Sequence, residues 1–244
     1  MDMGQDMFRA ETPRALLGGV LALAFVLTVV GIAAGQDETP PSIFSASLYP
    51  QYVGVNSFFL ITASVSDDVG VETVIALVSG PVESPTFTGS AQMTLDYGTV
   101  QSGNWSVRPF SFPDPTVAPD GTYQVDITAS DGAGNSATVS AGTVVLDRTP
   151  PDTSILSATN PIGRAVPDGG RTGFDTITFT FAGTDSVGIA FFDCTLDGVF
   201  TASCGSSYTL SDLTRGTHVL RVAAVDLAGN ADSTPAQFTW TVRH

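Results

Sequence analysis

The sequence predicts an all-β protein that contains two similar units, and two observations support this prediction. Residues 121–135 read GTYQVDITASDGAGN and residues 216–230 read GTHVLRVAAVDLAGN, so seven of the fifteen positions are identical. Around them apolar and polar residues alternate, as in ITFTF at 177–181 and FTWTV at 238–242. These residues are β-branched or aromatic, and Gly, Asp, Asn and Pro separate the runs, which is typical of short strands. No helical periodicity follows residue 36.

Shorter matches extend the repeat toward the amino terminus. They are TPP at 39–41 and 149–151, DDVGV and DSVGI at 67–71 and 185–189, and Gly80 and Gly198. The spacing between matches then shortens, which means that the first unit holds 23 more residues, within segment 81–120. We therefore predict a first domain at 36–147, a proline-rich linker at 148–151 and a second domain at 152–244. Consecutive prolines cannot continue a strand ladder and they stiffen such a join.

Residues 1–35 form a separate segment. The stretch ALLGGVLALAFVLTVVGIAAG at 15–35 is free of charge and is preceded by Arg14. It fits a signal peptide cleaved after its small residues, or a retained membrane-anchor helix, since about 20 apolar residues span a bilayer. A pilin-type leader is a third alternative, although the acidic residue expected early in such a helix is missing. Each alternative places the rest of the chain outside the cytoplasm.

The charge balance excludes several classes of function. The chain has 24 acidic and 9 basic residues, a net charge of −15, and every basic residue is arginine. Such a surface repels nucleic acid. Without lysine there is no Schiff-base chemistry, and the motifs of the common nucleophiles, phosphate-binding loops and zinc hydrolases are missing. We expect no enzymatic activity.

The second unit resembles the bacterial and archaeal Ig-like repeat domains of secreted and cell-surface proteins. The residues that carry this resemblance are DRTPPDTSI at 147–155, FDCTLDGVFTASC at 192–204, YTLSDLTRGTH at 208–218, VDLAGN at 225–230 and FTWTV at 238–242. The first unit resembles them more loosely. The resemblance implies two tandem immunoglobulin-like β-sandwiches, whose size and six to seven expected strands agree with the spacing of the runs. It also implies non-catalytic modules.

From these features we expect an extracellular or cell-surface structural or adhesion module that spaces or presents binding surfaces. One alternative is a carbohydrate- or protein-binding module that uses Tyr97, Trp105, Phe110 and Phe112 of the longer segment, unless these aromatic residues complete the core. Another is a surface filament assembled by edge-strand pairing. The expected partners are other surface proteins, glycans or further copies of the chain. We expect contact with a membrane only through the amino-terminal segment.

Acidic turn residues are the candidate metal ligands. The loop after the second strand and the loop before the last strand share one end of such a sandwich. In the second unit this predicts a Ca²⁺ site formed by Asp147, Asp152, Asp185 and Asp226, since Ca²⁺ takes six to eight oxygen ligands. The first unit repeats the pattern. The alternative is that these residues only shape turns, because Asp hydrogen-bonds its own backbone there. We expect no other cofactor.

Four further residues have predicted roles. Cys194 and Cys204 flank a hairpin signal in an exported domain, so we expect them to form a disulfide. Asn104 begins an N-glycosylation sequon. Tyr123 stands where a tyrosine corner ties its hydroxyl to the backbone, and His218 occupies the matching position in the second unit with a packing or hydrogen-bonding role.

Overall fold

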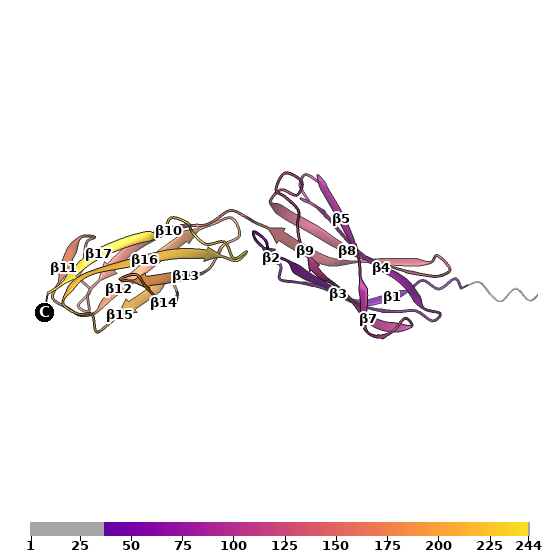
Figure 1. The fold of residues 1–244 in the computed structure, drawn as a ribbon, viewed down its shortest axis with the longest axis horizontal. Coiled ribbons are helices and arrows are strands. Elements are labelled where there is room, and N and C mark those ends of the chain that lie inside the picture. The colour runs from indigo at the N-terminus through magenta and orange to yellow at the C-terminus, as the bar shows by residue number, and fades with distance from the viewer. Residues whose placement is uncertain (1–36, 244) are drawn as a thin grey trace, which may run out of the picture. The chain divides into compact units, whose positions relative to one another are not determined.

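A computed structural model describes residues 37–243. The predicted signal or anchor segment at 15–35 therefore lies outside the described residues. Within 37–243 the chain forms seventeen strands and no helix (Figure 1). Accordingly, no helix suited to crossing a membrane occurs in the described part. The all-β prediction is confirmed.

Strands β1 to β9 form a sandwich of two sheets with one core between them. One sheet has the order β1 (Ser42–Tyr49), β3 (Phe59–Ser66), β7 (Ser102–Phe110) and β6 (Thr94–Thr99). The other has the order β2 (Tyr52–Val53), β9 (Ser136–Leu146), β8 (Gly121–Asp131), β4 (Val71–Gly80) and β5 (Phe87–Gln92). Only the β2–β9 pair is parallel among these strands.

The sequence alternation explains this layering. Along β8, Tyr123, Val125, Ile127 and Ala129 are buried, and the residues between them point away from the core. Successive side chains of a strand face opposite sides of the sheet, so a period of two places one apolar row against the opposite sheet.

Strands β10 to β17 repeat the arrangement. One sheet has the order β10 (Asp152–Thr159), β12 (Ile177–Thr184) and β15 (Ser207–Leu210). The other has the order β11 (Gly170–Thr172), β17 (Ala236–Val242), β16 (Gly216–Asp226), β13 (Ile189–Leu196) and β14 (Val199–Cys204). Phe179 and Trp240 are among its fully buried residues.

The longer segment of the first sandwich forms an additional strand and contributes aromatic residues to the core. It supplies strand β6, which has no counterpart in the second sandwich, and β7 is longer than the matching β15. Trp105 and Phe110 are buried, and Phe112 is half-buried against Tyr123 at a ring-centroid distance of 4.6 Å. Of the four aromatics considered for binding, only Tyr97 is exposed, at 68%.

The second sandwich contains the predicted disulfide. Cys194 on β13 and Cys204 on β14 are bonded, both are buried, and their Cα atoms are 6.1 Å apart. The bond links two neighbouring antiparallel strands and forms part of the core. The prediction of this pairing is confirmed.

The matched positions on the penultimate strands both bind the backbone. The hydroxyl of Tyr123 donates a hydrogen bond of 2.5 Å to the carbonyl of Pro119, which confirms the tyrosine corner. In the second sandwich, Nε2 of His218 lies 2.8 Å from the carbonyl of Thr214. In both cases the acceptor lies four residues upstream, so two different side chains serve one structural purpose.

Candidate functional site

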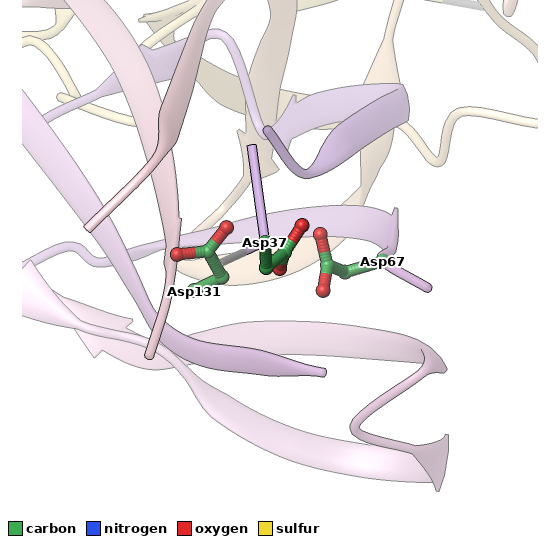
Figure 2. A group of neighbouring side chains, drawn as sticks. All are labelled: Asp37, Asp67 and Asp131. Atoms are coloured by element: carbon green, nitrogen blue, oxygen red, sulfur yellow. The ribbon is translucent and has the colours of Figure 1, made fainter. Parts of the chain in front are cut away.

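Three aspartates converge at one end of the first sandwich. Asp37 precedes β1, Asp67 follows β3 and Asp131 ends β8. One carboxylate oxygen of each lies within 4.8 Å of those of the other two. Figure 2 shows the carboxylate of Asp37 between those of the other two residues. Segments far apart in the sequence thus bring three acidic side chains to one point.

Backbone N–H groups fix two of these carboxylates through one oxygen each. Oδ1 of Asp67 accepts hydrogen bonds from the N–H groups of Val69, at 3.1 Å, and Gly70, at 2.7 Å. Oδ1 of Asp37 accepts one from the N–H group of Thr39, at 3.0 Å. These are the local turn bonds that aspartate favours, so part of the turn-forming interpretation holds.

The second oxygen of both side chains has no hydrogen-bond partner. Oδ2 of Asp67 and Oδ2 of Asp37 are buried and unpaired. The Asp67 residue as a whole is only 7% exposed. Buried polar atoms normally have a partner, so turn formation alone does not account for these two oxygens.

Asp131 is held by the loop that follows it. Its Oδ1 accepts hydrogen bonds from the N–H groups of Ala133 and Asn135, and its Oδ2 accepts one from the Asn135 side chain at 2.8 Å. Burial acts to raise the pKa of the Asp131 carboxyl, but the hydrogen bonds from Asn135, Ala133 and Gly134 outweigh it and lower the pKa below its ordinary value. Asn135 also donates to the carbonyl of Asp37 at 3.0 Å.

The second sandwich builds the same arrangement from matched residues. Asp147, Asp185 and Asp226 form a group with the same mutual distance limit, and Asn230 donates to the carbonyl of Asp147 at 2.9 Å. Here Oδ2 of Asp147 accepts a hydrogen bond of 2.8 Å from the hydroxyl of Ser186. The clusters therefore differ at this oxygen, because a serine hydroxyl contacts an atom whose counterpart in the first cluster is unpaired.

The structure brings together three of the four calcium candidates that the sequence suggested. Asp152 is not in the group: it is exposed at the start of β10, opposite Thr184. Calcium binding at the second group stays a prediction. Sequence reasoning missed Asp37, although the TPP repeat offered a signal, since Asp37 and Asp147 both stand two residues before its threonine.

The remaining predicted residues lie apart from these clusters. Asn104 is half-buried on β7, and its Oδ1 accepts a hydrogen bond of 2.6 Å from Ser64. Its glycosylation stays a prediction. Nδ1 of His218 lies 2.8 Å from Oδ2 of Asp197. Burial acts to lower the pKa of His218, but the Thr214 carbonyl and the Asp197 carboxylate outweigh it and raise the pKa above its ordinary value.

One comparison with known proteins finds a family model that matches the first sandwich. Residues 28–148 match the family described as a bacterial Ig-like domain, which confirms the resemblance identified from the sequence. The match covers the first sandwich, whose motifs resembled the family more loosely. No curated protein matches the chain.

Several solved structures have a similar fold. The fibronectin(III)-like modules of Clostridium thermocellum CbhA are 18% identical, with 83% of this chain and 94% of that chain covered and a TM-score of 0.42. The FN1–FN3 domains of chicken CNTN1 are 14% identical, with 84% of this chain and 66% of that chain covered and a TM-score of 0.41. Bacteroides ovatus SGBP-B, solved in complex with a mixed-linkage heptasaccharide, is 12% identical, with 84% of this chain and 71% of that chain covered and a TM-score of 0.25. At these identities the likeness concerns the fold alone.

The family match and the disulfide together indicate an extracellular or surface protein. Disulfides persist in oxidising compartments and are rare in the cytosol. Ig-like folds typically serve as non-enzymatic modules.

Proposed function

We propose that the chain is a non-enzymatic spacer or adhesion module of a cell surface, made of two tandem Ig-like domains that hold binding surfaces at a distance. The observation that supports this role is the duplication of the framework. Each sandwich has its own core, its own ordered loops around an aspartate cluster, and a matched bond from its penultimate strand to the backbone. The duplicated features are the ones that hold each sandwich together, and repeated structural units of this kind suit a protein that acts as a spacer.

Export through residues 15–35 completes this proposal. The segment would act as a signal peptide or as an anchor helix, and the acidic sandwiches would lie outside the membrane. The partners would be other surface proteins or glycans.

Stretching single molecules of the full chain by its two ends tests the spacer role. Two independent domains should unfold in two separate force steps, whereas a single combined step would contradict the proposal. The disulfide joins residues 10 apart in sequence and spans 6.1 Å between their Cα atoms, so its reduction should lengthen one step by about 30 Å, at about 3.5 Å per released residue. The other step should keep its length, which assigns the steps to the two sandwiches.

Exposure at the surface needs a second experiment. In intact cells, an externally added protease, a reagent that does not cross the membrane, should cleave the chain, and Cys194 and Cys204 should be oxidised when recovered. A chain that is protected from the reagent and carries reduced cysteines would contradict an extracellular role.

A binding module is the second candidate, and the exposed ring of Tyr97 is the observation that favours it. This ring lies on β6, at the edge of its sheet. Exposed aromatic rings can stack on sugars or anchor a protein partner. A glycan array with the wild-type chain and the Tyr97→Ala variant tests this candidate. Glycan binding that is lost in the variant supports it, whereas equal binding by both proteins would show that Tyr97 does not contact the glycan.

A further inference from the structure

We propose that Asp37, Asp67 and Asp131 bind one Ca²⁺ ion at the end of the first sandwich where the described chain begins. The sequence had pointed to the second sandwich, whereas the structure gives the stronger case to the first.

The first cluster contains two carboxylate oxygens that have no hydrogen-bond partner. The turn bonds occupy Oδ1 of Asp37 and Asp67, and those bonds fix both side chains. Their Oδ2 atoms are buried without a donor, and Asp67 is more than nine-tenths buried. Figure 2 shows the Asp67 carboxylate directed toward Asp37. A cation at this point would supply the partner that both atoms lack.

The charge of the cluster also calls for a cation. One oxygen from each of the three carboxylates lies within 4.8 Å of the other two, and burial weakens the screening by water. The ion pairs among residues 37–243 join Arg108 to Asp96, Arg148 to Asp120 and His218 to Asp197, so none of them reaches the cluster. A divalent ion would offset the repulsion between the carboxylates.

The donor set favours Ca²⁺ among the common metals. All candidate ligands are carboxylate oxygens, and neither histidine nor cysteine belongs to the group, which disfavours zinc and copper. Mg²⁺ dehydrates reluctantly and usually takes only one or two carboxylates, whereas Ca²⁺ accepts three and completes six to eight ligands with water. Extracellular calcium modules have dissociation constants of about 10⁻⁴ to 10⁻³ M.

A bound ion would link three segments. Asp37 lies on the chain that enters the first sandwich, Asp67 lies on the β3–β4 loop, and Asp131 is the last residue of β8, where the β8–β9 loop begins. Asn135 already joins two of these segments by donating to both Asp131 and the Asp37 carbonyl. The ion would add the third, so the entering chain and both loops should become harder to unfold when Ca²⁺ is present.

Calorimetric titration of the full chain in mild detergent with CaCl₂, at neutral pH, tests the proposal. The Asp67→Asn variant keeps an oxygen that can accept the turn bonds but loses a charge. We expect it to bind one Ca²⁺ fewer per chain than wild type, or to bind that ion at least about tenfold more weakly. The matched control is Asp68→Asn, which makes the same charge change at the next residue, an exposed one outside the group.

Wild-type protein that binds no Ca²⁺, or equal binding by the Asp67→Asn and Asp68→Asn variants, would overturn the proposal. Preference for MgCl₂ over CaCl₂ would overturn the assignment of calcium. If Asp67→Asn fails to fold, Asp37→Asn takes its place, because Asp37 precedes the first strand and belongs to neither sheet. The same loss of one ion is expected from it. Because the assay counts bound ions, its result is independent of the spacer role.

Discussion

The two sandwiches solve the same packing problem with different side chains at one matched position. Tyr123 and His218 each bind the carbonyl four residues upstream. The phenol packs among aromatic rings from the longer segment, Phe87 and Phe112, whereas the imidazole contacts Asp197 and Trp240. The comparison shows that the backbone bond is the requirement and that the side chain is adapted to its neighbours.

The two sandwiches also differ in the features that stabilise their cores. The first has additional strand and buried aromatic residues, and the second has a disulfide. The chain contains two tryptophans, Trp105 in the first core and Trp240 in the second. Replacing either one by Phe leaves a single tryptophan, so its emission can follow the free energy of unfolding for one sandwich at a time in urea.

The largest effect should come from emptying the aromatic core of the first sandwich. Phe110 is 8% exposed and packs on Phe59 at a centroid distance of 5.2 Å. Phe110→Ala should destabilise the first sandwich by about 3–5 kcal/mol, because it removes buried apolar surface and leaves a cavity. Tyr97→Ala, an exposed aromatic of the same segment, is the control and should change stability by less than about 0.5 kcal/mol. Similar losses in both variants would show that the segment is not core.

Removing the disulfide should have the next largest effect, and only in the second sandwich. Replacing both Cys194 and Cys204 by Ala should lower its free energy of unfolding by about 2–4 kcal/mol, since the unfolded chain regains entropy. Dithiothreitol should reproduce the direction of this change in the Trp105→Phe variant, while the Trp105 signal of the Trp240→Phe variant stays constant. A matching shift of the Trp105 signal would contradict independent sandwiches.

Tyr123→Phe should have a smaller effect. It keeps the buried ring and removes only the bond to the Pro119 carbonyl, so the first sandwich should lose about 1–2 kcal/mol. Because the hydroxyl stays neutral below pH 9, the loss should be the same at pH 6 and pH 8. An unchanged free energy of unfolding would mean that water replaces the hydroxyl at no cost.

The smallest effect should be the pH response of His218. The raised pKa means that the folded second sandwich binds the proton more tightly than the unfolded chain does. The stabilisation is complete below the unfolded value of about 6.5 and is lost as the pH rises through the folded pKa. The Trp240 signal should therefore report falling stability from about pH 6.5 upward. His218→Tyr, which copies the first sandwich, should remove this dependence, and a flat wild-type curve would contradict the ion pair.

The strands were predictable because burial follows a period of two, whereas the cluster depended on where loops meet. Asp67, Asp131 and their repeats were expected in or beside loops that a sandwich brings to one end, so sequence reasoning identified them. Asp152 was misplaced because it lies near the linker in sequence but begins a strand. Its counterpart at the repeat offset is Ser42, which offers no carboxylate. Unpaired oxygens, such as those of Asp67 and Asp37, emerge only from three-dimensional packing.

The asparagine that follows each penultimate strand donates a hydrogen bond to an aspartate that precedes the first strand of the same sandwich, and this aspartate marks the start of each copy of the repeat. Asn230 binds the carbonyl of Asp147, a residue that comes directly after the last strand of the first sandwich. Asn135 binds Asp37 in the same way. Each copy thus carries its own closing residue ahead of its first strand. If a gene segment that starts at this aspartate is duplicated, the new copy contains both the aspartate and the asparagine of this hydrogen bond. Further copies would therefore lengthen the protein while each keeps the bond to its own entering chain.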